Sequence, residues 1–292
     1  MVYLIFAIMT APVITVAMRL SNGRVKSKTM MFLANYATCI LCSLFFLNIS
    51  ESIPKEEYTF PLWYGIIMGF FFLVTFLFYE FNIRKNGVIL SNIFSKLGKI
   101  IPVIVTMIFF NELPTPLKII GIVLSVIAII IMNIDFKKKD DIENTENPLS
   151  DKKSFNPAYL LLVIFLLFSG ICDSSTTVFK HISIPELNGF FLLSIFGSAF
   201  IFSLILLIIK REKIGLTDLL FGLIIGIPNY FSSFLTLKAL ETIPAQVVYP
   251  TLCVGSILVV TIFGVIMFKE KLKFKDYIGA LIIIAALILL NI

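Results

Sequence analysis

Two segments of the chain repeat each other without a gap. They read "FFNELPTPLKIIGIVLSVIAIIIMNI" at residues 109–134 and "MFKEKLKFKDYIGALIIIAALILLNI" at residues 267–292. The alignment places Glu112 on Glu270 at an offset of 158 positions, and this offset holds throughout. Each segment ends in an apolar run of roughly 20 residues, the length that crosses the hydrocarbon core of a bilayer as an α-helix. The repeat therefore predicts two related halves that each end in a membrane-spanning helix.

The composition excludes a soluble globular protein. Of 292 residues, 59% are hydrophobic and 14% are charged, whereas soluble domains carry about 25% charged residues. The net charge of +6 comes from cations scattered through short connections, so we expect no nucleic-acid partner. The first residues, "MVYLIFAIMTAPVITVAM", hold no cation before the apolar run, which predicts a retained membrane helix rather than a cleaved signal peptide.

The apolar segments predict an all-α membrane protein with ten transmembrane helices. A polar stretch at residues 136–156 interrupts the series and has no apolar period, which is typical of a surface linker. It divides the chain into five segments within residues 1–135 and five within residues 157–292. The predicted helices cover residues 2–18, 29–48, 60–83, 88–111, 115–135, 157–179, 187–209, 216–239, 245–268 and 273–291.

An odd number of spans in each half makes the second half enter the membrane from the opposite side. The sequence therefore predicts two inverted-topology five-helix repeats, an architecture of secondary transporters in which substrate binds near the bilayer midplane. The odd-numbered connections hold 18 Lys and Arg residues, and the even-numbered connections hold 4. Cytoplasmic loops carry an excess of these residues, so the count predicts that both termini lie outside the cell.

The repeated segments also carry a family resemblance. In each, a helix ends in "FxxE" and a short turn leads to a helix with an early glycine, as in "FFNELPTPLKIIG" and "MFKEKLKFKDYIG". With this pattern twice in register, the chain resembles the drug/metabolite transporter superfamily in its ten-helix form with two EamA domains. The resemblance implies a first EamA repeat at 1–135 and a second at 157–292. It also implies a central cavity lined by the first, third, fourth, sixth, eighth and ninth helices, which opens alternately to each side.

The first helix is also similar to that of the small multidrug resistance exporters. The segment "AIMTAPVITVAMRLSNG" at residues 7–23 has their apolar helix followed by a basic residue, Ser and Gly. Those exporters carry a proton-coupling glutamate where this chain has Ala11. Their exchange of protons for cations is therefore not implied by that position.

Two lysines interrupt the fourth apolar segment. Lys96 and Lys99 lie within "SKLGKIIP" at residues 95–102, roughly 12 and 17 Å into the predicted helix at 1.5 Å per residue. A lysine at the centre of a spanning helix costs about 2.5–3.5 kcal/mol, so both side chains are expected to face the interior of the bundle. Pro102 should leave the carbonyl of Gly98 without its helical partner and kink the helix there.

Two acidic residues are candidates to pair with these lysines. If residues 60–83 and 88–111 form a hairpin that turns at Gly87, Glu80 lies level with Lys96, while Asp173 of the sixth segment could meet Lys99 between the halves. Two interpretations stay open. The four charges form a neutral network that only fastens helices, or at least one lysine faces the cavity and receives an anionic group or exchanges a proton. We expect Glu80 to hold Lys96 and Lys99 to contact substrate.

Other polar side chains complete the predicted substrate site. The full set of candidates is Lys96, Lys99, Asn92, Asp173, Asn229, Tyr230 and Tyr249. Asn35 and Tyr36 are expected to join helices to one another. Glu112 and Glu270 are interpreted as structural, and Lys238 with Glu241 as a local ion pair.

The sequence contains no recognisable catalytic or metal-binding set. The chain has four cysteines and a single histidine, His181, with no metal-ligand spacing and no Gly-rich phosphate loop. We therefore expect no enzymatic activity, no cofactor and no metal.

The sequence predicts a secondary transporter in the bacterial plasma membrane, a multi-pass protein that acts as a monomer. Its substrate would be a small polar metabolite, anionic or zwitterionic, moved by alternating access with H+ or Na+ as a coupling ion. A translocase of a lipid or lipid-linked sugar and an exporter of cationic drugs are the alternatives. The sequence does not distinguish import from export.

Overall fold

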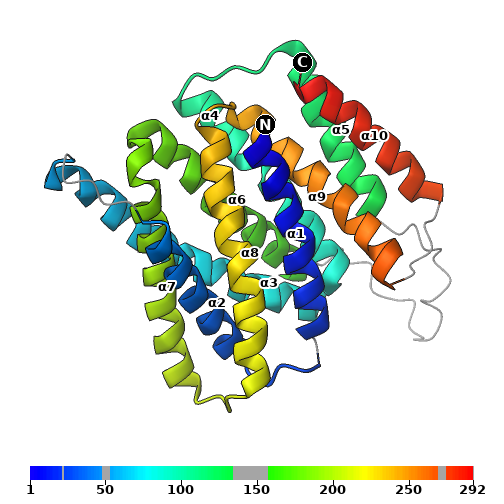
Figure 1. Cartoon of the computed structure of the whole chain (residues 1–292). Helices are drawn as coiled ribbons and strands as arrows, with labels where there is room; N and C mark the ends of the chain where they lie inside the picture. Colours follow the sequence, from blue (N-terminus) through cyan, green and yellow to red (C-terminus); the bar gives the residue numbers. More distant parts are fainter. Residues whose placement is uncertain (22, 48–52, 134–156, 269–273, 292) are drawn as a thin grey trace, which may run out of the picture.

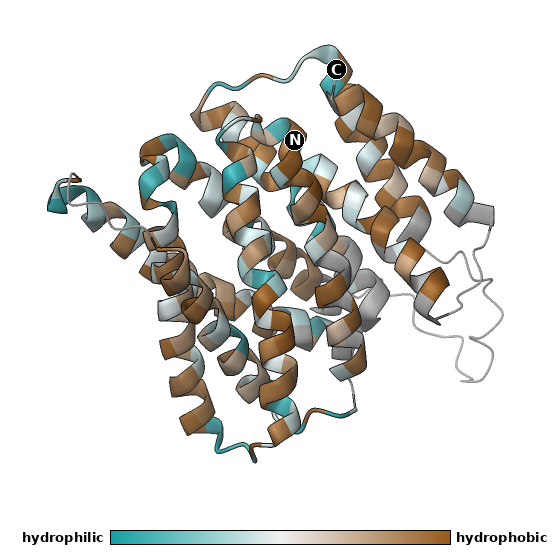
Figure 2. Ribbon diagram, viewed as in Figure 1, coloured by the Kyte–Doolittle hydropathy of each residue, from teal (hydrophilic) through white to brown (hydrophobic). Residues whose placement is uncertain are grey.

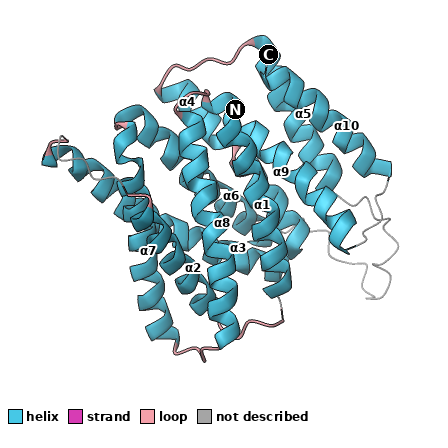
Figure 3. Ribbon diagram, in the orientation of Figure 1, coloured by secondary structure: helices cyan, strands magenta, loops and turns pink. Residues whose placement is uncertain are grey.

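The protein is a bundle of helices in the computed structural model, which describes residues 1–21, 23–47, 53–133, 157–268 and 274–291 (Figure 1). No strand occurs in these ranges (Figure 3). The chain starts and ends at the same end of the bundle, as Figure 1 shows.

The helices overlap every apolar segment that the sequence predicts. Their bounds are α1 Val2–Ser21, α2 Lys28–Phe45, η1 Lys55–Tyr58, α3 Thr59–Gly98, α4 Ile100–Phe109, α5 Pro116–Asn133, α6 Pro157–Ile182, η3 Pro185–Leu187, α7 Asn188–Lys210, α8 Leu216–Leu240, α9 Ala245–Phe268 and α10 Phe274–Asn291.

Among the described residues, 6 helical spans are long and apolar enough to cross a membrane. They are Lys28–Phe45, Lys55–Tyr79, Leu160–Ile182, Pro185–Lys210, Leu216–Leu240 and Ala245–Phe263. Pro116–Ile131 and Tyr277–Leu290 are shorter apolar helices. Hydrophobic residues cover the helices, and hydrophilic ones gather toward their ends and in the connections (Figure 2). The chain is therefore an integral membrane protein that crosses the bilayer several times.

The predicted turn at Gly87 is wrong, because the backbone stays helical through it. α3 continues from Thr59 to Gly98. A glycine inside a helix costs only about 1 kcal/mol relative to alanine, so Gly87 alone does not end one. The helical hydrogen bonding breaks instead at Lys99, between α3 and α4. This is where the missing N–H of Pro102, the third residue of α4, is expected to kink the chain.

Contacts with α6 show that α3 is bent. In its first part, Thr75 bonds Cys172 at 3.2 Å and Asn82 bonds the Leu161 carbonyl at 3.2 Å, so this part runs antiparallel to α6.

The chain then runs along α6 in the opposite direction. Gly98 packs on the carbonyl of Leu166, and the ring of Phe110 stacks on His181 at 4.0 Å. The chain therefore reverses its direction along α6 between Asn82 and Gly98, as a hairpin would, but it does so without the break in the helix that the sequence predicts at Gly87.

Packing between the halves uses glycines at close crossings. α3 packs on α7 and α8 packs on α2. A Cβ atom at Gly69 would lie 1.9 Å from Ser198 Oγ, and one at Gly222 would lie 2.4 Å from the Cβ of Ala34. Small residues allow two membrane helices to approach closely enough for backbone and side chain to pack.

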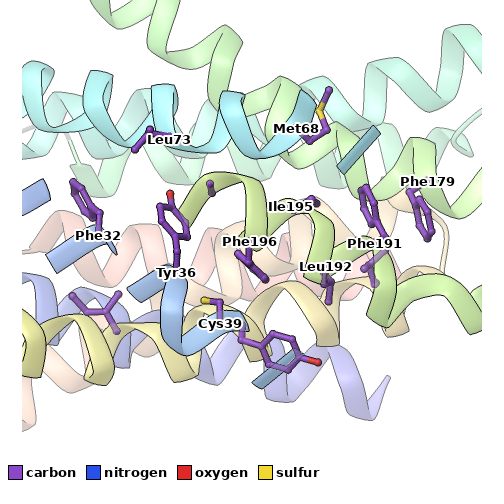
Figure 4. Close-up of a cluster of buried hydrophobic side chains, with 14 of the residues drawn as sticks. Phe32, Tyr36, Cys39, Met68, Leu73, Phe179, Phe191, Leu192, Ile195 and Phe196 are labelled. Carbon is purple, nitrogen blue, oxygen red and sulfur yellow. The ribbon is translucent and has the colours of Figure 1, made fainter. Parts of the chain in front are cut away.

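The largest described core lies where α2, α3 and α7 meet (Figure 4). The rings of Phe179 and Phe191 stack with centroids 3.9 Å apart, and Tyr64 stacks on Phe191 at 5.6 Å. This aromatic packing joins α3, α6 and α7.

Candidate substrate site at the crossing of α4 and α6

The site begins with a close approach of two backbones. A Cβ atom at Gly98 would lie 2.9 Å from the carbonyl oxygen of Leu166. One at Gly170 would lie 2.1 Å from Cδ1 of Ile101 and 2.6 Å from its Cβ. Only glycine fits at Gly170 without moving a helix, because rotation of the Ile101 side chain does not displace its Cβ. The crossing brings Lys99, directly after Gly98, against α6.

Lys99 meets Asp173 at this crossing. Its Nζ donates hydrogen bonds to Oδ1 at 3.1 Å and to Oδ2 at 3.3 Å. The two side chains are 29% and 27% exposed, although α6 is flanked by α3, α4 and α8. The contact that the sequence analysis considered for these two residues is therefore present, and the pair is not sealed between helices.

The pair keeps unused hydrogen-bonding capacity. An ammonium group carries three donors and a carboxylate about four acceptor sites. Two bonds between Lys99 and Asp173 leave a donor on one side and acceptors on the other. A small polar molecule that reaches the exposed part of the pair can bind either charge without first breaking the pair.

Lys96 lies one helical turn before Lys99 and differs from it in its contacts. Its carbonyl accepts a weak hydrogen bond from the Cys253 thiol at 3.6 Å. In the described part of the structure, no carboxylate forms an ion pair with its ammonium group. The side chains of Glu80 and Asn92 lie outside the described residues, so the pairing of Glu80 with Lys96 and the role of Asn92 stay predictions.

Tyr249 of α9 also contacts the turn of α6 that carries Asp173. Its hydroxyl donates to the carbonyl of Asp173 at 2.6 Å and lies 2.7 Å from Thr176 Oγ1 and 2.8 Å from Thr177 Oγ1. Only 1% of the tyrosine is exposed. It is therefore buried against the helix that carries Asp173.

The remaining predicted site residues on α8 lie away from the pair. Asn229 Nδ2 donates to Asn35 Oδ1 at 3.2 Å, which confirms Asn35 as a contact between α2 and α8. Tyr230 is fully buried and its ring stacks on Phe46 at 6.1 Å. The proposed contacts of Asn229 and Tyr230 with substrate stay predictions. Tyr36 is fully buried, and its hydroxyl has no hydrogen-bond partner among the described residues.

Polar groups also join helices at the end of the bundle where α4, α6 and α8 finish. Glu112 Oε1 lies 3.6 Å from Lys180 Nζ and 3.3 Å from His181 Nε2. Lys238 Nζ donates to Glu241 Oε1 at 2.8 Å, which confirms the predicted local ion pair. Glu270 lies outside the described residues.

Sequence reasoning missed two groups that build the site. The first is the pair of glycines at 98 and 170, whose role depends on a crossing between distant segments. The second is Thr176 and Thr177, whose signal was the run of hydroxyl residues directly after Asp173. Within the described ranges, no group of three or more His, Cys, Asp or Glu side chains is arranged to hold a metal ion.

Comparisons with known proteins concern the family and the fold. Residues 159–292 match the EamA-like transporter family. An uncharacterized protein of Haemophilus influenzae is 23% identical over 300 residues, covering 97% of this chain and 95% of that protein. A protein of known crystal structure superposes with a TM-score of 0.72 over 100% of this chain and 97% of its own, at 14% identity. This structural likeness concerns the fold alone. The all-helical fold fits the drug/metabolite transporter superfamily, whose EamA members are membrane transporters.

Proposed function

We propose that this chain, whose residues 159–292 match the EamA-like transporter family, is a secondary transporter of a small polar metabolite with an anionic or zwitterionic group. It acts in the bacterial plasma membrane by alternating access. The observation that carries the proposal is the Lys99–Asp173 pair, which lies inside a bundle of apolar helices and yet is 29% and 27% exposed. A pair sealed between helices would offer no exposed surface to a substrate.

The same proposal includes two inverted five-helix repeats, and the glycine crossings support it. Gly65 and Gly69 of α3 pack on α7, and Gly222 and Gly226 of α8 pack on α2. Gly222 lies 157 positions after Gly65, and Gly226 lies 157 positions after Gly69, one position fewer than the offset of the two terminal segments. Two equivalent crossings between equivalent helices are expected when one half repeats the other.

The site itself has a counterpart in this repeat. Gly98 packs on α6 near Lys99, and Gly255, also 157 positions later, packs on Ile8 of α1. The placement of both termini at one end of the bundle (Figure 1) fits an even number of crossings. We therefore propose ten spans, with both termini outside the cell as the distribution of Lys and Arg predicts.

The charge at the site favours an anionic group on the substrate. Lys96 and Lys99 lie one turn apart, and Asp173 is the only carboxylate among the described residues that pairs with either. The excess positive charge would be offset by a carboxylate or phosphate. A zwitterion would match both Lys99 and Asp173. The protein is proposed to act as a monomer, with a gradient of H+, Na+ or the substrate itself as its energy source.

The first test of this proposal measures ligand binding. Purified protein is screened by thermal shift against a metabolite library, because a ligand that binds the folded state raises the melting temperature by mass action. Ligands that stabilise it are then assayed for uptake into proteoliposomes. Lys99→Met should lower binding and transport by about tenfold or more, the loss of at least ~1.4 kcal/mol from a charge-assisted contact.

The matched control is Lys238→Met, which removes a lysine of similar exposure, 28%, at the end of α8. It should leave binding and transport near the wild-type level. Normal transport by Lys99→Met would refute the role of the central pair.

One observation favours a second candidate, a translocase of a lipid or lipid-linked sugar. An open groove of about 470 Å³ lies between α1 and α8. Its lining is apolar and consists of Phe6, Met9, Thr10, Val13, Ile227, Pro228, Phe231 and Leu235. Transfer of a fluorescent phospholipid between leaflets of proteoliposomes tests this candidate, and the secondary-transporter proposal expects no transfer above that of empty liposomes.

A further inference from the structure

The part of α6 that carries Asp173 holds three hydroxyl side chains in succession that bond back to carbonyls of their own helix. Ser174 Oγ donates to Gly170 at 2.7 Å, Ser175 Oγ to Cys172 at 2.6 Å, and Thr176 Oγ1 to Asp173 at 2.9 Å. Such bonds compete with the helical hydrogen bonds and often bend a helix. An additional contact at this turn can therefore help to fix where α6 presents its carboxylate to α4.

Tyr249 supplies an external constraint at that point. Its single proton goes to the carbonyl of Asp173, and Thr177 Oγ1, 2.8 Å away, donates to the tyrosine oxygen. Thr176 donates to either the tyrosine or the Asp173 carbonyl. One hydroxyl from α9 thus joins three positions on a single turn of α6. Because Tyr249 is 1% exposed, its own movement is limited by packing.

We infer that Tyr249 is a positioning residue of the proposed transporter: it fixes this turn of α6 and so holds the Asp173 carboxylate opposite Lys99. The role differs from the direct substrate contact that its sequence position suggested. The inference rests on the proposed function for its biological meaning. Its physical content, that the Tyr249 hydroxyl determines where the Asp173 charge lies, is testable without a known substrate.

The experiment measures the charge next to position 99 with two thiol reagents of opposite sign. In a background in which the four native cysteines are replaced by alanine, Lys99→Cys places a thiol beside Asp173. Its rates of reaction with a cationic and an anionic methanethiosulfonate are compared. A carboxylate held nearby favours the cationic reagent. Tyr249→Phe should lower the ratio of cationic to anionic rates by at least about threefold, because moving a unit charge by a few ångströms in the protein changes the local potential by that order.

Tyr36→Phe is the matched control. It removes the hydroxyl of an equally buried tyrosine that has no partner among the described residues, so it should not change the ratio. Asp173→Asn should lower the ratio on its own, and adding Tyr249→Phe to it should have no further effect. A general loss of structure would change the ratio in both backgrounds.

A second probe covers the case in which Lys99→Cys does not fold. Ser95→Cys lies one turn earlier on α3 and retains Lys99, and Tyr249→Phe should lower its ratio in the same direction. An unchanged ratio at both probes would overturn the positioning role while leaving the transport proposal intact. No reaction at either probe in the parent protein would mean that the pair is closed to water, and both proposals would fail.

Discussion

The sharpest test of the central pair is a double-mutant cycle on Asp173 and Lys99. Asp173→Asn keeps the shape of the side chain but leaves the Lys99 ammonium without its partner. Breaking a fully buried pair costs about 3–5 kcal/mol, whereas an exposed pair contributes about 0–1 kcal/mol. With side chains 27% and 29% exposed, the pair lies between these limits. We expect Asp173→Asn to lower the free energy of unfolding by about 2 kcal/mol, or the melting temperature by roughly 4–8 °C.

The partner variants complete the cycle. Lys99→Met removes a desolvated charge and keeps apolar bulk, so it should change the melting temperature little or raise it. Combining it with Asp173→Asn should restore most of the lost stability, because no unpaired ammonium is left. The melting temperatures are measured on purified protein in detergent.

A second ion pair provides the control. Lys238 and Glu241 lie 2.8 Å apart with 28% and 23% exposure, but they are neighbours on one helix end. Their coupling, measured with Lys238→Met and Glu241→Gln, should be about 0.5 kcal/mol. If the coupling between Lys99 and Asp173 is no larger than this, the two residues do not act as a pair inside the bundle, and the reasoning about the site fails.

Three further predictions concern the rest of the molecule. Gly69→Ala would place a Cβ 1.9 Å from Ser198 Oγ and 2.4 Å from the Ile195 carbonyl, and should cost about 1–3 kcal/mol in melting experiments. Gly197→Ala, with nothing within 4 Å, should be neutral or slightly stabilising. Burial raises the pKa of Glu212, but hydrogen bonds from Ser27 and Thr29 and the nearby Lys210 outweigh it and lower that pKa below its usual 4.5. The ionised Glu212 carboxylate therefore stabilises the fold fully above about pH 4.5, and this stabilisation is lost as the pH falls further. Glu212→Gln should lower the melting temperature at pH 7 but not at pH 3. A cysteine at Asn147 in the 136–156 linker should react only with membrane-permeant maleimides in intact cells, and labelling by an impermeant one would reverse the proposed orientation.

The sequence alone determined the class of the protein and the position of its helices. Apolar runs of roughly 20 residues have few alternatives to a helix in a membrane, because every backbone polar group must be bonded within the segment. The predicted ends therefore lie within a few residues of the observed ones for α1, α2 and α5 to α10. The same argument identified Lys99 and Asp173 as interior charges, because each interrupts such a run.

Only the tertiary structure decided how these residues meet. The continuation of α3 as a helix through Gly87 was not predictable, because a glycine is tolerated inside a helix when packing supports it. The contact of Lys99 with Asp173 depends on the approach of Gly98 and Gly170, which are 72 positions apart. The contact of the Tyr249 hydroxyl with the Asp173 carbonyl depends on where α9 lies against α4, which the sequence of α9 does not show. The apolar pattern of each segment predicts that it lies in the bilayer. Contacts between segments depend on the shapes of side chains where two helices cross, and a local sequence pattern does not predict these.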